Sequence, residues 1–268
     1  MSVSVLSACI ESVGVLGPGF PDWSVASRVL SGASPWEPAP TVLPPPLSLP
    51  SAERRRTGAV VRLSLAVGLE ATRTAGIDPA GLPAVFTSSG GDGQNCHEIC
   101  EALASAERLI SPTRFHNSVH NAPAGYWGIA TGDTAAANSL CAHDGSFAAG
   151  LLEALCQVAV DRTRVLLIAY DTSYPEPMRS VRPIPDAFGV ALLLAPPAAT
   201  AALAHLELSW SEAPADRMAD PALERLRAAG IAARSLPLLA QLAHATAGRV
   251  LIDYQDGARV ALEVSACR

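Results

Sequence analysis

The sequence predicts an α/β fold in which buried strands alternate with amphipathic helices. Residues 164–170 and 187–194 are continuous apolar runs, as expected of strands that are covered on both faces. Residues 146–160 instead repeat apolar side chains at helical spacing. The short apolar segment 136–141 precedes this helix, and a tight turn over 142–145 would join the two. A strand-to-helix elbow is therefore expected near the middle of the chain.

The other elements are expected on either side of this elbow. The same patterns predict strands at 3–9, 82–87, 205–210, 249–254 and 258–264. Helices are expected at 23–30, 51–75, 94–109, about 116–129, 221–230 and 236–247. The proline-rich stretch 35–50 cannot be helical and is predicted to be an extended surface strap.

Composition indicates an oligomeric chain. Of its 268 residues, 49% are hydrophobic and 16% charged, which is apolar for a monomer of this size. The sequence shows no apolar run of membrane-spanning length and no secretion-type segment, so we expect a cytoplasmic chain. Six irregularly spaced cysteines, with Cys141 and Cys156 in apolar segments, are interpreted as reduced, buried thiols.

The basic residues exclude several functions. All 19 are arginines, so a P-loop lysine, a Schiff base and a pyridoxal-phosphate lysine are impossible. The net charge of −6, without a basic stripe, argues against nucleic-acid binding. No cofactor is predicted.

The elbow is the candidate reactive position. A side chain at a helix N-terminus lies beside unpaired N–H groups and the positive end of the helix dipole, which favour developing negative charge. Acyl-transfer enzymes hold a nucleophile at such a place. The candidates are the five residues from Cys141 to Gly145.

This stretch resembles the active-site region of β-ketoacyl synthases. In that family a cysteine precedes a glycine by three residues, a second glycine follows five residues later, and an alanine comes after it; Gly145, Gly150 and Ala154 fit. This frame places the nucleophile position on Ala142, with Cys141 one residue early on the expected buried side of the strand. The resemblance implies a thiolase-like fold, layered α/β/α with mixed sheets.

The resemblance covers the first half of such an enzyme and weakens after about residue 195. We therefore divide the chain into a ketosynthase-like half, 1–195, and a shortened second part, 196–268, which together form one compact unit. The family's two catalytic histidines lie in second-half motifs that are missing here. No intact catalytic set is predicted.

More narrowly, the blocks Ser88–Gly93, Phe115–Gly132 and Ser146–Ala154 resemble chain-length-factor subunits of aryl polyene systems. The resemblance implies a non-condensing subunit that pairs with an active ketosynthase, works with an acyl carrier protein and walls the acyl tunnel. The tunnel or interface candidates are Asn121, Ala124, Gly125, Tyr126, Trp127, Phe147, Ala148 and Ala149. The small residues would leave room for the chain and the bulky ones would stop it.

Alternatives remain open. Cys141 could be the nucleophile of an acyltransferase, activated by His143, His116 or His120. The chain could also be a non-catalytic acyl-binding homodimer.

Three smaller features also have two interpretations each. The run Arg54–Arg56 could receive an acidic carrier protein or be a solvated face. Cys96 and Cys100 could bind zinc or pack one helix face, and the latter is preferred. The glycine-rich turn at 88–93 fits no phosphate-binding frame and is interpreted as a tight turn.

Overall fold

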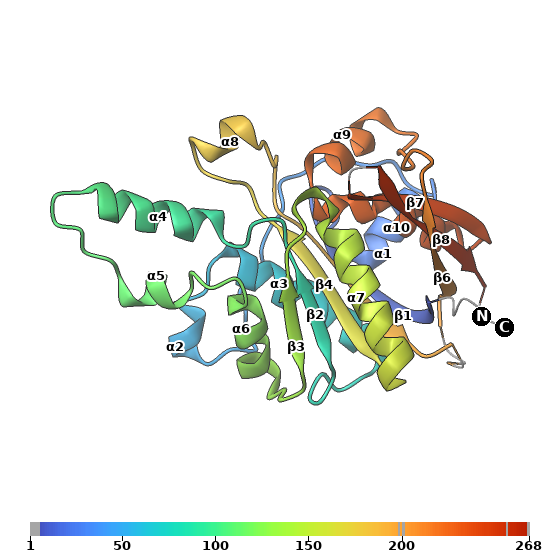
Figure 1. Ribbon diagram of the computed structural model, residues 1–268, viewed down its shortest axis with the longest axis horizontal. Helices are drawn as coiled ribbons and strands as arrows, with labels where there is room; N and C mark the ends of the chain where they lie inside the picture. The colour runs from blue at the N-terminus through green and yellow to red at the C-terminus, as the bar shows by residue number, and fades with distance from the viewer. Residues whose placement is uncertain (1–5, 198, 200–201, 256, 267–268) are drawn as a thin grey trace.

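The computed structural model describes residues 6–197, 199, 202–255 and 257–266, and its eight named strands form one mixed sheet (Figure 1). Residues 3–5 of the first predicted strand lie outside the described residues. The strand order is β3-β2-β4-β5-β1-β6-β8-β7. The strands are β1 (Leu6–Leu16), β2 (Ala84–Thr87), β3 (Ala137–Leu140), β4 (Val165–Asp171), β5 (Phe188–Ala195), β6 (Ala204–Ser211), β7 (Gly248–Gln255) and β8 (Ala258–Ser265). β2 pairs in parallel with β3 and β4, and the remaining pairs are antiparallel.

Helices cover both faces of the first part of this sheet. They are α1 (Trp23–Leu30), α2 (Ser51–Arg54), α3 (Ala59–Ala75), α4 (Gly93–Ala104), α5 (Pro112–His116), α6 (Ala122–Thr131), α7 (Ser146–Asp161), α8 (Met178–Val181), α9 (Pro221–Ala229) and α10 (Leu236–His244), with 3₁₀ turns η1 (His143–Gly145) and η2 (Ala232–Ser235). α3 and α6 pack on one face, whereas α1, α7, η2 and α10 pack on the other. The α/β/α layering is therefore as predicted.

The side chains of the central strands point alternately to the two faces of the sheet, and this divides the core into two clusters. In β4, Leu167 joins the cluster beneath α7, and its neighbours Leu166 and Ile168 join the cluster beneath α3. Side chains of successive strand residues point to opposite faces, so a strand covered on both sides must be apolar throughout. All seven β4 residues are buried.

The strands that follow residue 195 continue the same sheet. β6 pairs with β1, and β8 and β7 follow (Figure 1). Leu206, Leu262 and Val250 from these strands belong to the cluster beneath α7, while Glu207 and Glu263 on the opposite face are exposed. The predicted boundary at 195/196 thus falls between two strands of one sheet.

Several predicted helices differ from those in the structure. The expected helix 51–75 is divided into α2 and α3, because Gly58 is extended at the N-cap of α3. The expected helix 94–109 ends at Ala104, and Ser105 has extended backbone. The expected helix 116–129 is replaced by α5 and α6. Residues 35–46 form neither helix nor strand, in agreement with the predicted strap.

α4 and α5 project from the body of the molecule (Figure 1). Of the twelve α4 residues, Asn95 alone is buried, although short helices in water depend on packing for stability. We call residues 93–120 the arm. Among the described helices, none is long and apolar enough to cross a membrane.

Candidate functional site

The elbow lies between the end of β3 and the start of α7. Ala142 precedes the η1 turn, and His143 adopts a left-handed backbone with φ of 50°. A side chain at Gly145 would place its Cβ 1.9 Å from the main-chain oxygen of Tyr254 in β7. At Gly150 the Cβ would lie 2.6 Å from Thr87 Cγ2. Both glycines of the predicted frame are therefore required for close packing of α7 against neighbouring strands.

The main-chain N–H of Ala142 is already hydrogen bonded. It donates to Ser146 Oγ at 3.1 Å, and that hydroxyl donates to the main-chain oxygen of His143 at 2.7 Å. An oxyanion hole needs N–H groups that are free to meet the substrate. In this structure, the residue at the predicted nucleophile position has neither a nucleophilic side chain nor a free amide.

Cys141 is exposed, so its predicted burial was wrong. The strand pairing ends at Leu140, and the alternation of strand faces therefore no longer applies to the next residue. The Cys141 thiol donates to the main-chain oxygen of Ser89 at 3.1 Å. Cys156, which was also expected to be buried, is half-buried, and burial raises the pKa of its thiol.

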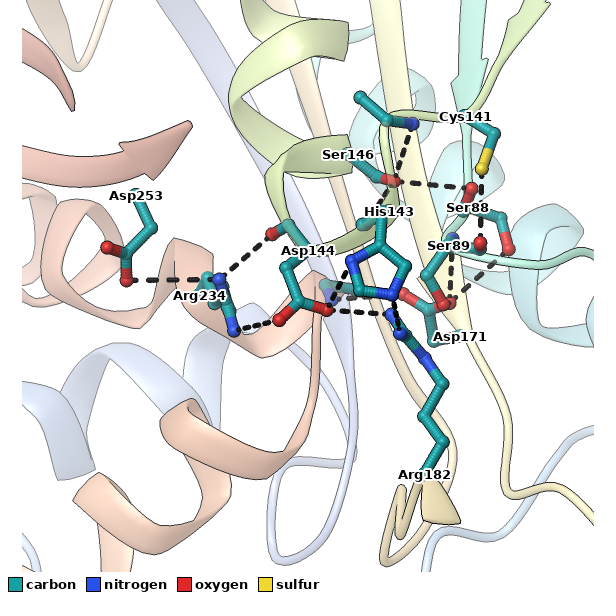
Figure 2. Close-up of polar contacts among 12 residues, drawn as sticks. Ser88, Ser89, Cys141, His143, Asp144, Ser146, Asp171, Arg182, Arg234 and Asp253 are labelled. Atoms are coloured by element: carbon teal, nitrogen blue, oxygen red, sulfur yellow. Dashed lines mark hydrogen bonds and ion pairs between the residues drawn. The ribbon is translucent and has the colours of Figure 1, made fainter. Parts of the chain in front are cut away.

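The three candidate histidines are held in different places. His143 contacts Arg182 through Nε2 and Asp144 through Nδ1, the latter at 3.4 Å (Figure 2). His120 Nε2 lies 3.1 Å from the main-chain oxygen of Leu140. His116 is exposed at the end of α5.

Asp144 is clamped by two arginines (Figure 2). Arg182, which follows α8, donates to one carboxylate oxygen at 2.8 Å, and Arg234 of η2 donates to the other at 3.0 Å. Arg234 also donates to the main-chain oxygen of Asp144 at 3.1 Å. The elbow is thereby tied to the second part of the chain.

A buried carboxylate lies next to the clamp. Asp171, at the end of β4, accepts from Ser89 N at 2.9 Å, Ser89 Oγ at 2.6 Å and, through its other oxygen, Ala232 N at 3.1 Å (Figure 2). Burial raises the pKa of Asp171 to about 6, although these hydrogen bonds act in the opposite direction. Asp171 therefore connects the β2–α4 turn to η2.

A cleft of about 920 Å³ opens between α4, α8 and η2. Its walls include Cys96, Cys100, Tyr174, Met178, Val181 and Ile231. His143, Asp144, Arg182 and Arg234 are also part of its lining. The cleft thus has apolar walls and charged groups contributed by the elbow clamp.

The bulky tunnel candidates do not share a wall. Tyr126 and Trp127 are buried beneath α3, and the Trp127 ring packs against Phe86 at 6.4 Å between centroids. Phe147 and Ala148 are buried in the cluster on the opposite face of the sheet. These four residues are core residues of the described monomer and lie on two opposite faces of the sheet.

The other tunnel candidates are more accessible. Asn121 and Gly125 are exposed on α6, and Ala124 and Ala149 are half-buried.

The run Arg54–Arg56 is partly exposed. Arg55 and Arg56 are exposed, and Arg56 forms an ion pair with Glu53 at 3.1 Å.

No group of three or more potential metal ligands (His, Cys, Asp or Glu) was found within the described residues. Cys96 and Cys100 lie on one face of α4, as expected, and both are exposed. The glycine-rich turn serves local packing, because a Cβ at Gly90 or Gly93 would lie about 2 Å from the Tyr174 side chain.

Sequence reasoning missed Asp171, Arg182 and Arg234. Asp171 follows an apolar strand, a position where functional side chains often gather, and this signal was available. The partners of the two arginines could not be inferred from sequence spacing, because Asp144 is 38 residues from Arg182 and 90 residues from Arg234.

The layered sheet and the glycine-framed elbow define an α/β protein of the thiolase-like class. Residues 30–255 match the family model described as the N-terminal domain of β-ketoacyl synthase. The chain belongs to this family.

Similar solved structures agree on the fold. The complex of the ketosynthase ApeO with its chain length factor ApeC, from Xenorhabdus doucetiae, has a chain that is 22% identical with a TM-score of 0.73; the match covers 96% of this chain and 99% of that one. A chain in the structure of AntDE:AntF, a type II polyketide acyl carrier protein in complex with its ketosynthase, is 11% identical with a TM-score of 0.73. The match covers 97% of this chain and 99% of that one.

A ketosynthase from module 1 of the bacillaene synthase of Bacillus amyloliquefaciens gives 14% identity and a TM-score of 0.57. The match covers 80% of this chain but 47% of that one. At these identities the likeness establishes the fold. The search of curated proteins gave no significant match.

Proposed function

We propose that this chain is a non-condensing, ketosynthase-like chain-length factor that pairs with an active ketosynthase and shapes its acyl tunnel. The main support is the elbow, where Ala142 is the residue at the predicted nucleophile position and its N–H is hydrogen bonded to Ser146. Condensation needs a thiolate to carry the acyl chain and free N–H donors for the oxyanion. Neither is available at Ala142.

The similar structures are compatible with this proposal. The match covers 99% of the similar chain in the complex of a ketosynthase with its chain length factor, and 47% of the bacillaene ketosynthase. The division into a family-like half and a shortened second part belongs to the same proposal.

The partner surface in this proposal is the arm together with the β3 edge. β3 ends the sheet, so its outer side is unpaired within the described chain, and Ala137 and Asn138 are exposed. Large apolar side chains are exposed on the arm and on α6 beside it, namely Leu103, Leu109, Phe115, Val119 and Ile129. Exposed apolar groups gathered in one region mark protein interfaces.

The same surface supports a revised tunnel assignment. Phe115, 68% exposed, and Leu109, 74% exposed, can reach a partner, whereas Trp127 and Phe147 cannot without unfolding this chain. Asn121, Ala124, Gly125 and Ala149 remain compatible with the interface. Carrier-protein docking at the exposed Arg55 and Arg56 is a further part of the proposal.

One observation favours the rival acyltransferase, namely the exposure of Cys141. However, its thiol donates to the main-chain oxygen of Ser89 at 3.1 Å rather than to one of the candidate imidazoles. His143, the candidate histidine nearest to Cys141 in sequence, contacts Arg182 and Asp144 instead.

The test is reconstitution with a ketosynthase and carrier protein encoded nearby. We expect a stable heterodimer whose product length changes when Phe115 is replaced by alanine, with Val160→Ala as a control on an equally exposed apolar residue at the far end of α7. A Phe115→Ala heterodimer with unchanged product length would refute the tunnel assignment.

Intact-mass analysis after incubation with acyl carrier protein tests the rival. The proposal expects no acyl adduct on this chain. An adduct that disappears in Cys141→Ser would replace the proposed function with the acyltransferase. A homodimer that ignores every ketosynthase offered would instead support the scaffold.

A further inference from the structure

Two thiols of α4 lie one helical turn apart. Cys96 and Cys100 are both exposed, and both line the cleft between α4, α8 and η2. Side chains at positions i and i+4 of a helix are neighbours on one face. We propose that this pair is a two-thiolate site for a soft monovalent cation such as Cu(I). The inference concerns this chain alone and does not depend on the proposed function.

The spacing of the pair favours a bridging ion over a disulfide. The Cβ atoms at i and i+4 of a helix are about 5–6 Å apart, whereas a disulfide requires about 3.5–4.5 Å. Helix α4 would therefore have to distort before the two sulfurs could bond. Two thiolates on one ion, each at about 2.3 Å as in zinc sites, are up to about 4.6 Å apart, and the helical spacing allows this separation.

The donors in the cleft select a soft ion that needs few ligands. Structural zinc sites use four ligands, but no group of three or more potential metal ligands was found among the described residues. Hard cations need oxygen ligands, and the carboxylate that lines the cleft, that of Asp144, is bound by Arg182 and Arg234. Thiolates and thioethers prefer Cu(I), and the thioether of Met178 lines the same cleft.

The ion has to displace protons from the thiols. Partial desolvation, followed by the neighbouring Cys100 thiol, raises the pKa of the Cys96 thiol. Two S–H bonds break and two metal–sulfur bonds form, so the balanced step is M⁺ + 2 RSH → [M(SR)₂]⁻ + 2 H⁺. No oxidant or reductant takes part.

Binding would stabilise a helix that has little packing. Asn95 is the buried residue of α4, and short helices depend on packing for stability. An ion held by both thiols connects two consecutive turns, and a ligand that binds the folded helix alone stabilises it. Amide hydrogen exchange in α4 should therefore become slower when Cu(I) is bound.

The experiment is an anaerobic titration of the full chain with Cu(I) in competition with the chelator bathocuproine disulfonate. We expect a single tightly bound Cu(I) and at least tenfold weaker binding of Zn²⁺. Iodoacetamide labelling with peptide mapping should show that Cu(I) protects Cys96 and Cys100 but leaves Cys141 reactive. Binding of Zn²⁺ as tight as that of Cu(I) would overturn the proposal, as would the absence of protection at the pair.

Serine variants locate the site. Cys96→Ser and Cys100→Ser should each weaken Cu(I) binding at least tenfold, and both should fold because the side chains are exposed. Cys141→Ser is the matched control, since it removes an exposed thiol that does not line the cleft, and it should bind Cu(I) like the unmodified chain. Loss of binding in Cys141→Ser, with the other two variants unaffected, would refute the site.

A double variant tests the spacing itself. Cys100→Ser combined with Leu103→Cys keeps two exposed thiols on α4, but they are then about 10 Å apart along the helix axis. One ion cannot bridge that distance, so this variant should bind Cu(I) as weakly as Cys100→Ser does. Binding equal to that of the unmodified chain would show that any two thiols of α4 suffice, and the proposed site would be wrong.

Discussion

Arg234 binds Asp144 twice, through the carboxylate at 3.0 Å and the main-chain oxygen at 3.1 Å. Asp144 belongs to the elbow, and Arg234 lies in η2, 90 residues further along the chain. This pair therefore connects the elbow to the segment that follows residue 195. Its contribution to stability can be measured.

A double-mutant cycle of Asp144→Ala and Arg234→Ala should give a coupling free energy of about 1 kcal/mol. The estimate is discounted because the Asp144 side chain is 45% exposed. The Arg56–Glu53 pair on α2, whose arginine is 54% exposed, is the matched control and should couple by about 0.3–0.5 kcal/mol. Urea unfolding measures both. Equal coupling in the two pairs would contradict a structural role for the clamp.

Asp171 should make stability depend on pH. Its pKa is raised from 3.8 to about 6 by burial, so the folded chain holds this proton more tightly than the unfolded chain does. The resulting stabilisation is complete below pH 3.8 and is lost as pH rises through 6, a change of roughly 3 kcal/mol.

The Asp171→Asn variant isolates this effect, because asparagine does not titrate. The difference in free energy of unfolding, variant minus unmodified chain, should increase between pH 4 and 7. Other carboxylates with raised pKa values, such as Glu70 and Asp92, are present in both proteins, so their contribution to the pH dependence cancels in this difference. A difference that stays constant with pH would show that Asp171 titrates normally.

Gly145 and Gly125 should respond oppositely to alanine. At Gly145 the new Cβ would overlap the Tyr254 main-chain oxygen, so we expect destabilisation by about 1–3 kcal/mol or more. At Gly125, inside α6, the Cβ would meet nothing within 4 Å, and helix propensity predicts stabilisation by about 0.5–1 kcal/mol. Thermal unfolding of the two variants checks both signs. A stable Gly145→Ala would mean that β7 does not approach the elbow this closely.

Trp127 should behave as a core residue. Trp127→Ala is expected to lower the free energy of unfolding by about 3–5 kcal/mol, because the side chain is buried beneath α3 against Phe86. Trp210, which is 56% exposed on β6, is the control and should lose less than about 1 kcal/mol. Chemical denaturation measures both. A small loss at Trp127 would return this residue to the tunnel surface.

The sequence by itself determined the order of the elements and the position of the elbow. The apolar run 164–170 and the helical repeat of α7 are local patterns, and length, composition and periodicity together distinguished this strand from this helix. The sequence also located Gly145 and Gly150, and the structure shows that close packing requires glycine at both positions.

The tertiary structure alone decided which side chains meet. Spacing along α6 and α7 did not reveal that Trp127 and Phe147 lie on opposite faces of the sheet, nor that the end of β3 exposes Cys141. The Asp144 clamp and the Asp171 bonds join residues up to 90 positions apart. Such contacts depend on how strands are ordered in the sheet, and strand order is set by long-range packing that no local pattern records.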